Sequence, residues 1–309
     1  MEGIVVKSTG SWYLVEDAEG KVHRGRLRGR FKLTLEDRRL SNPIAVGDRV
    51  TFVAETGGEE TVAITDIAER DNYLIRKSVH RKGESHILAA NLGQVLLVAT
   101  LAMPRTSLGF IDRFLVSAEA YRIPAVIALN KADLFEPEDL ELAQALQMLY
   151  KRLGYGFLIT SAADGQQLEA LRQVLDGKTT LLSGHSGVGK SSLVNTLVPG
   201  LDLRVGEISA FANKGTHTTT FAERHTLWAG THIIDTPGIK ELGLAEIEEA
   251  ELSHFFPEMR ALLNQCRYHN CRHVAEPGCA VRQAVDSGQI WPSRYESYRS
   301  MLAGDDNRR

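Results

Sequence analysis

A run of residues past the middle of the chain has the types and spacing of a phosphate-binding loop. Gly184-His185-Ser186-Gly187-Val188-Gly189-Lys190-Ser191 fits the pattern Gly-x-x-x-x-Gly-Lys-Ser/Thr at every fixed position. Glycines let the backbone turn tightly, so that successive N–H groups point at a polyphosphate. Lys190 would supply charge to the outer phosphates, and the Ser191 hydroxyl would bind Mg²⁺. The helix expected from Ser192 to Leu197 would turn its positive end toward the same anion.

A second motif, Asn130-Lys131-Ala132-Asp133, follows the expected strand Ala125–Leu129 and has the chemistry to select a base. The Asp133 carboxylate can accept the ring N–H and the exocyclic amino protons of guanine, a pair that adenine does not offer. Asn130 and the stem of Lys131 would complete the base pocket. Ser161 and Ala162 follow the next expected strand, and their backbone would add a contact. Together these residues predict a preference for GTP over ATP.

Two segments after the phosphate loop hold candidate ligands for Mg²⁺ and the terminal phosphate. Residues 214–220 form a loop rich in hydroxyl groups, in which Thr218 and Thr219 are the candidate Mg²⁺ ligands. The neighbouring Thr220 is an alternative that the sequence leaves open. Asp235 ends an expected strand and would hold Mg²⁺ through its water ligands, while the Gly238 N–H would contact the terminal phosphate.

All three cysteines lie in one short C-terminal window, in the pattern Cys266-x₄-Cys271-x-His273-x₅-Cys279. Three thiolates and one imidazole make a closed tetrahedral site, and soft thiolates prefer Zn²⁺ to Mg²⁺. No position is left open for a substrate, so this zinc would be structural. His269 is an alternative imidazole ligand.

The N-terminal part of the chain reads as a small β-barrel of the oligonucleotide-binding (OB) type. The expected strands are Gly3–Lys7, Trp12–Glu16, Lys21–Leu27, Arg49–Ala54 and Thr61–Ile67. Arginines alternate with other residues in the third strand, so an extended backbone places them on one face. Four aligned like charges repel unless they meet solvent or phosphate, so this face is either solvated or RNA-binding. These residues are Arg24, Arg26, Arg28 and Arg30.

The rest of the chain reads as an α/β domain followed by helices. Apolar strands and helices alternate between residues 95 and 182, which predicts a parallel sheet covered by helices on both faces. The polar, basic stretch 67–91 is expected to be a linker or an ordered loop. Helices are expected at Leu244–His254, Ala280–Ser287 and Arg294–Leu302. The domain prediction is an RNA-binding barrel over residues 1–70, a GTPase domain over 71–240 and a helical zinc domain over 241–309.

Composition limits the class of protein. The 309 residues are 43% hydrophobic and 24% charged with a net charge of −3, as in ordinary globular proteins, so any basic surface must be local. The first residues lack a secretory pattern, and no apolar run has the length of a membrane span. We therefore expect a cytoplasmic monomer that does not bind membranes.

The order of the motifs is unusual, because the base-recognition motifs precede the phosphate loop. This order resembles the circularly permuted GTPases of the RsgA family (YjeQ and YloQ), which act in small-subunit biogenesis. The likeness covers nearly the whole chain, from the barrel to the cysteine cluster. It implies a Mg²⁺-dependent GTPase that binds GTP and GDP, the 30S ribosomal subunit and 16S rRNA late in maturation. It also implies that the subunit stimulates hydrolysis, which times release, and, with the spacing, it favours His273 as the fourth zinc ligand.

One residue favours a different function. Ile239 follows Gly238, where many GTPases have a glutamine that orients the attacking water. An apolar side chain cannot do so, which predicts slow basal turnover with His217 as the nearest candidate for the role. The alternative function is an RNA-binding assembly scaffold in which the nucleotide is only a structural ligand.

Overall fold

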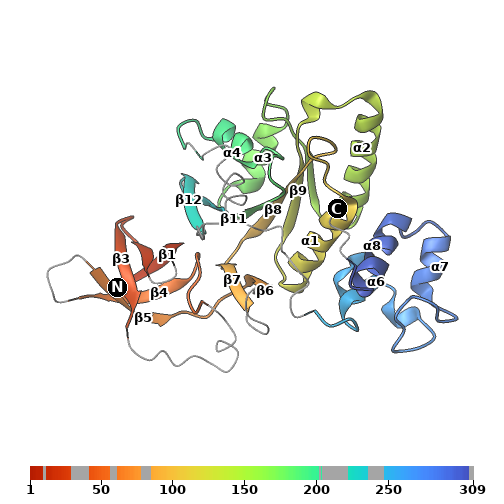
Figure 1. The fold of residues 1–309 in the computed structure, drawn as a ribbon, viewed down its shortest axis with the longest axis horizontal. Coiled ribbons are helices and arrows are strands. Elements are labelled where there is room, and N and C mark those ends of the chain that lie inside the picture. The colour runs from red at the N-terminus through yellow and green to blue at the C-terminus, as the bar shows by residue number, and fades with distance from the viewer. Residues whose placement is uncertain are drawn as a thin grey trace, which may run out of the picture.

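The computed structural model describes residues 1–9, 12–28, 42–55, 61–77, 85–201, 203, 222–235 and 247–305. Figure 1 shows three parts in a row: a β-barrel at one end, an α/β domain in the middle and a group of helices at the other end. This is the predicted class of fold. The boundaries between the three domains stay predictions.

The barrel is built from the five predicted strands, within one or two residues of their expected bounds. They are β1 (Glu2–Ser8), β2 (Tyr13–Asp17), β3 (Val22–Leu27), β4 (Arg49–Ala54) and β5 (Thr61–Ile67). The strand order is β1-β2-β3-β5-β4, and β4 also pairs with β1, which closes the sheet. Alternate side chains such as Val15, Phe52 and Ile64 fill the interior, as the period of two requires.

The central sheet has five parallel strands in the order β10-β9-β8-β11-β13. Their bounds are Gly156–Ile159 for β10, Ala125–Leu129 for β9, Gln94–Ala99 for β8, Thr179–Ser183 for β11 and Thr231–Asp235 for β13. In β8, Leu97 packs toward helices α1 (Leu108–Ala120) and α2 (Pro137–Arg152), whereas Leu96 packs toward α3 (Leu168–Leu175) and α4 (Lys190–Leu197). The expected helical layers on both faces are therefore present.

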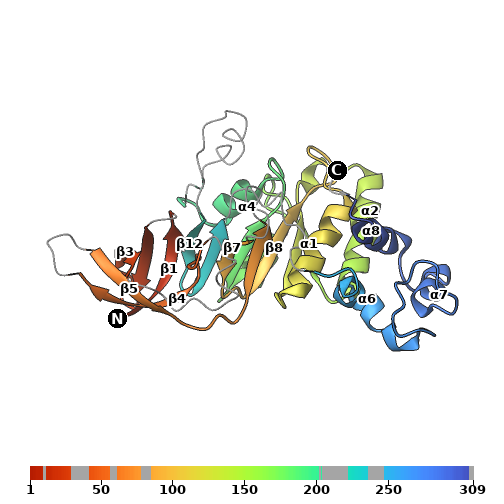
Figure 2. The ribbon, with the colours of Figure 1, turned by 60° about the horizontal axis from the view of Figure 1, so that its bottom comes forward.

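An additional strand, β12 (Glu223–Trp228), runs antiparallel to β13 and was missed from the sequence. Its far edge meets β1 of the barrel, with Glu223 opposite Lys7. The two side chains form an ion pair of 2.6 Å, and Arg224 pairs with Glu16 at the same distance. One sheet therefore continues from the α/β domain into the barrel (Figure 2).

The prediction of a linker or loop over residues 67–91 is wrong, because this segment contains a β-hairpin. Strands β6 (Tyr73–Lys77) and β7 (Ser85–Ala90) pair antiparallel. The hairpin packs on the barrel, since Asn42 donates to the Ile87 carbonyl at 2.9 Å and accepts from its N–H at the same distance. The many polar residues of the segment obscured β7, in which all six residues except His86 are buried.

The C-terminal part is helical, but its first helix differs from the expectation. Of the predicted helix Leu244–His254, residues 244–246 lie outside the described part, and 247–254 form turns and the start of a 3₁₀ helix instead. The other elements are η5 (Leu252–Phe255), α6 (Pro257–Arg260), η6 (Leu263–Gln265), α7 (Ala280–Asp286) and α8 (Pro292–Leu302). Within the described part, no helix is both long and apolar enough to span a membrane.

Candidate functional site

The carboxyl ends of the parallel strands bring the predicted nucleotide-binding segments to one edge of the sheet. The phosphate loop follows β11, and the Asn130–Asp133 motif follows β9. The Ser161-Ala162 pair begins two residues after β10 ends. Asp235 is the last residue of β13 and pairs in register with Leu182 of β11, just before the phosphate loop. The described parts of the predicted site therefore lie together, although the sequence separates them widely.

The phosphate loop requires glycine at two of its fixed positions. Gly184 has a φ of +138°, and a Cβ there would lie 2.2 Å from the carbonyl oxygen of Val98. Gly189 has a φ of +93°, and its Cβ would lie 2.5 Å from the amide nitrogen of Asn130. A side chain at position 184 would therefore collide with the backbone of β8, and one at position 189 with the Asn130 amide. Helix α4 begins directly after this turn, at Lys190, two residues earlier than expected.

The side chains of Lys190 and His185 are held by contacts at the phosphate loop. The Lys190 ammonium donates to the carbonyl oxygens of Gly184 at 2.7 Å and His185 at 2.9 Å, so it folds over the loop. The His185 ring packs on Phe110 of α1, with 4.0 Å between ring centroids. Val188 is buried, while the loop's hydroxyl side chains are half-buried: Ser186, Ser191 and Ser192.

Asn130 links the base motif to the phosphate loop. Its side chain is buried, and its amide nitrogen donates to the Val188 carbonyl at 2.9 Å. The Thr160 hydroxyl donates to its amide oxygen at 3.3 Å. Because both the nitrogen and the oxygen of this amide are hydrogen-bonded, Asn130 fixes the base motif against the phosphate loop. A direct contact from Asn130 to a base stays a prediction.

Asp133 is exposed at the same edge and is held by one neighbour. The Ser161 hydroxyl donates to an Asp133 carboxylate oxygen at 2.6 Å and accepts from the N–H groups of Ala163 and Asp164. The sequence suggested only a backbone contribution from Ser161 and missed this positioning bond. Ala162 is joined to α4, because its carbonyl accepts a 3.4 Å hydrogen bond from the Thr196 hydroxyl.

Four of the residues predicted to bind the nucleotide or Mg²⁺ or to act in catalysis lie outside the described part of the chain. They are His217, Thr218, Thr219 and Gly238. Their roles therefore stay predictions.

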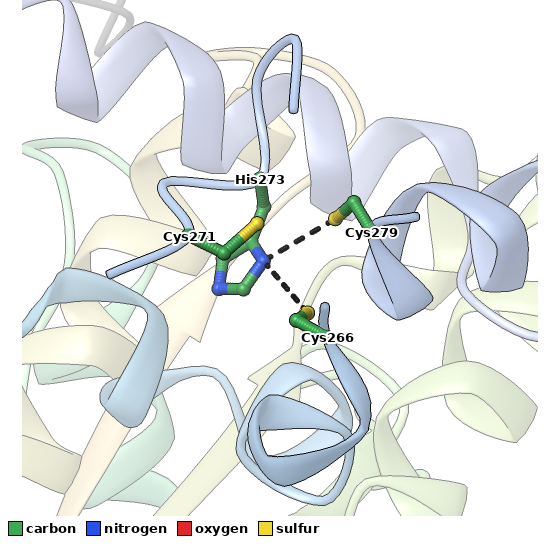
Figure 3. A group of neighbouring side chains, drawn as sticks. All are labelled: Cys266, Cys271, His273 and Cys279. Carbon is green, nitrogen blue, oxygen red and sulfur yellow. Dashed lines mark hydrogen bonds between the residues drawn. The ribbon is translucent and has the colours of Figure 1, made fainter. Parts of the chain in front are cut away.

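The predicted metal ligands form a compact cluster (Figure 3). The ligand atoms of Cys266, Cys271, His273 and Cys279 all lie within 4.8 Å of one another. The Nδ1 atom of His273 lies 3.6 Å from the sulfur of Cys266 and 3.4 Å from that of Cys279. Zinc–sulfur bonds of about 2.3 Å place tetrahedral ligands at this kind of separation, so the donor set fits a zinc ion. His269, the alternative imidazole, is not among the grouped ligands found in the described residues.

Surrounding contacts fix the loop that carries His273. Burial would raise the pKa of Glu276, but hydrogen bonds from the backbone N–H groups of Arg272, Val274 and Ala275 outweigh it and lower that pKa to about 2. The Tyr295 hydroxyl of α8 donates to the His273 carbonyl at 2.6 Å. Burial lowers the pKa of His273, which favours the neutral imidazole that binds metals.

Removing one imidazole distinguishes the two candidate ligands. We expect His273→Ala to lose the bound zinc and to loosen α7 and α8, because three thiolates alone leave the ion incompletely bound. His269→Ala is the matched control and should retain about one zinc per chain. Metal analysis and circular dichroism measure both effects, and binding of GDP should survive in each variant. Loss of zinc from His269→Ala alone would contradict the assignment.

Two of the predicted arginines lie in β3 and a third directly follows this strand. Arg24, Arg26 and Arg28 are all exposed, whereas Arg30 lies outside the described residues. The Arg24 guanidinium stacks over the ring of Trp12, 4.1 Å from its centroid, and Arg26 lies 5.9 Å from it. No local sequence pattern singles out Trp12, because the stacking depends on β2 and β3 lying side by side.

Comparison with known proteins decides the family. The family model described as RsgA GTPase matches residues 67–245, and the model of the RsgA N-terminal domain matches residues 2–62. This chain belongs to the RsgA GTPase family. A relative from Bacteroides fragilis, named small ribosomal subunit biogenesis GTPase RsgA, is 49% identical and aligns over 98% of this chain and 96% of its own. A relative of the same name from Cytophaga hutchinsonii is 48% identical over 100% of both chains.

Solved structures of RsgA-type proteins have the same fold. The crystal structure of YjeQ from Thermotoga maritima aligns with a TM-score of 0.79 and 37% identity, over 100% of this chain and 99% of that one. The structure of YloQ, a circularly permuted GTPase, aligns with a TM-score of 0.72 and 29% identity, over 100% of this chain and 96% of the other. The chain is therefore a GTP hydrolase with a barrel, a permuted GTPase domain and a C-terminal Cys₃His cluster, as the motif order predicted.

Proposed function

We propose that this RsgA-family GTPase binds the small (30S) ribosomal subunit through 16S rRNA and assists its late maturation. Hydrolysis of GTP, stimulated by the subunit, then times release. The observation that carries the proposal is the similarity, over nearly the whole chain, to relatives named for small-subunit biogenesis. The cytoplasm is where such a protein would meet its substrate, and we propose that it acts there as a monomer.

The nucleotide would lie along the carboxyl edge of the sheet. Backbone N–H groups of residues 184–192 would bind its phosphates, together with the charge of Lys190. Asp133 would accept the donors of guanine, held in place by Ser161 at 2.6 Å. Mg²⁺, which the family implies, would offset phosphate charge when bound by Ser191 and a threonine of residues 218–219, with Asp235 holding its water ligands. The Gly238 N–H would contact the terminal phosphate.

The C-terminal cluster would hold one Zn²⁺ with a structural role. Its four protein ligands would complete a tetrahedral shell and leave no open position for a reacting molecule. Burial raises the pKa of the Cys271 thiol to about 12, so a bound cation is what would keep this sulfur as a thiolate. The cluster would therefore stabilise the loop between η6 and α7.

The exposed face of β3 would contact rRNA phosphates. When exposed arginines bind rRNA phosphates, they displace counterions condensed on the RNA. The affinity for RNA should therefore depend steeply on salt concentration. The half-buried ring of Trp12, already stacked with Arg24, adds an aromatic surface to this basic face.

A triple variant with Arg24, Arg26 and Arg28 each changed to Gln tests this contact. Removal of three phosphate contacts should reduce the slope of log affinity against log salt by about 2 to 3. Co-sedimentation with purified small subunits at several salt concentrations, in the presence of a non-hydrolysable GTP analogue, measures it. A double variant at Lys151 and Arg152, two exposed cations at the end of α2, is the control. An unchanged slope in the triple variant would contradict the assignment of β3.

A further inference from the structure

The segment that connects β8 to α1 lies between the two halves of the candidate nucleotide site. This segment, Leu101–Arg105, is not part of any of the motifs identified in the sequence. The ammonium group of Lys131, in the base motif, donates a hydrogen bond to the Met103 carbonyl oxygen. On the other side, a Cβ built on Gly187 of the phosphate loop would lie 3.4 Å from Cδ of Pro104, an ordinary contact distance. The segment therefore bonds to the base motif and lies close to the phosphate loop at Gly187.

Two buried threonines fix the shape of this segment. The N–H of Thr106 donates to the Thr100 carbonyl at 2.8 Å, and the N–H of Thr100 donates to the Thr106 hydroxyl at 3.1 Å. The Thr100 hydroxyl donates to the Pro104 carbonyl. Thr100 is 1% exposed and Thr106 is 5% exposed, so water does not compete for these bonds. The Met103 carbonyl is thus held in place from within its own loop.

The base motif needs such support. Lys131 has a φ of +66°, a backbone conformation that a lysine adopts at a cost, and its long side chain has many rotamers to lose. A carbonyl oxygen that fixes the ammonium group removes this freedom before the nucleotide arrives, which is how preorganisation raises affinity. The aliphatic stem of Lys131 then lies ready to pack against a base.

We propose that Leu101–Arg105 is a positioning segment for the guanine nucleotide. Its Met103 carbonyl orients Lys131 for the base, and its Pro104 ring limits movement of the phosphate loop at Gly187. Thr106 is accordingly a positioning residue that acts through Lys131 and touches no reacting atom. This inference rests on the proposed guanine nucleotide site.

Substitution of Thr106 tests the inference. Thr106→Val keeps the shape of the side chain but removes the hydroxyl that accepts from the Thr100 N–H, which frees the segment. We expect GDP to bind about tenfold more weakly and the KM for GTP to rise by a similar factor, with kcat unchanged. Thr106→Ser keeps the hydroxyl and should restore both values. Thr106→Ala removes the same hydroxyl and replaces Thr106→Val if the latter does not fold.

A double-mutant cycle separates positioning from general stability. Lys131→Met removes the ammonium but keeps the stem, so Thr106→Val should have no further effect on GDP affinity in that background. Multiplicative losses in the double variant, or unchanged GDP affinity in Thr106→Val, would overturn the role of the segment. Failure of the proposed site itself would be visible separately, because the unsubstituted protein would then bind ADP as tightly as GDP.

Discussion

An Asp133→Asn variant is expected to bind GTP and GDP at least about 10²-fold more weakly and to gain affinity for xanthine nucleotides. The hydroxyl of Ser161 holds one oxygen of Asp133 at 2.6 Å, and the asparagine oxygen can keep that bond. Its amide N–H groups would then face the N–H groups of guanine, donor against donor. Xanthine has a carbonyl in place of the exocyclic amino group, so it can accept from the new amide.

Calorimetric titration with GDP, XDP and ADP measures this exchange. Asp286→Asn is the matched control, because Asp286 is an exposed carboxylate at the end of α7, in the C-terminal helices. Its nucleotide preference should equal that of the unsubstituted protein. If Asp133→Asn kept the original preference, other residues would select the base, which would contradict the role assigned to Asp133.

An Arg294→Met variant is expected to lower the free energy of unfolding by about 3–5 kcal/mol. Arg294 of α8 is 1% exposed and pairs with Asp112 of α1 at 2.6 Å and with Glu258 of α6 at 2.7 Å. Tyr150 of α2 donates to the same Asp112 oxygen at 2.8 Å. Removal of the guanidinium leaves two carboxylates without their cation, one of them fully buried, at the contact between the C-terminal helices and the GTPase domain.

Denaturant unfolding of three variants tests the cause of this loss. Adding Asp112→Asn to Arg294→Met should recover part of the stability, because the buried uncompensated charge is gone. Arg260→Met is the control, since Arg260 pairs with Glu119 at 2.9 Å but its side chain is 52% exposed, and it should cost no more than about 1 kcal/mol. Equal losses for Arg294→Met and Arg260→Met would contradict the role of the buried cluster.

The buried cluster also bears on how the domains move. Arg294 and Asp112 fix α8 to α1, whereas the barrel meets β12 through two ion pairs, Lys7–Glu223 and Arg224–Glu16, each with at least one partly exposed side chain. The contact between α8 and α1 is the harder one to break, because exposed ion pairs contribute little to stability. We therefore expect the C-terminal helices to move with the GTPase domain, and any nucleotide-dependent rearrangement to occur between that domain and the barrel.

Local sequence patterns were sufficient to predict the bounds of an element where its apolar residues follow one simple periodicity. Strands β4, β5 and β9 have the expected bounds, since their apolar residues follow the period of a half-buried strand or the continuous run of a buried one. Strand β12 was missed because its sequence, Glu223–Trp228, is mostly polar and partly exposed at the junction with the barrel. The short elements η5, α6 and η6 were missed because each has too few turns for helical periodicity.

Motifs identified the chemistry of the site but not the contacts that position it. The fixed spacing of the phosphate loop and of the cysteine cluster is visible locally, and the structure brings each set together. The bond from Asn130 to Val188 joins residues 58 positions apart, and Arg294 meets Asp112 across 182 positions. Such pairs depend on how helices and strands pack, which no local pattern records.

The rate of phosphate release with and without purified small ribosomal subunits is the most direct test of the proposed function. At saturating GTP and Mg²⁺, the subunit should accelerate release by about tenfold or more, because the apolar Ile239 follows Gly238 where a glutamine would orient the attacking water. Large subunits serve as the control and should have little effect. No acceleration by small subunits, despite binding to them, would contradict timed hydrolysis and support a scaffold that holds its nucleotide as a structural ligand.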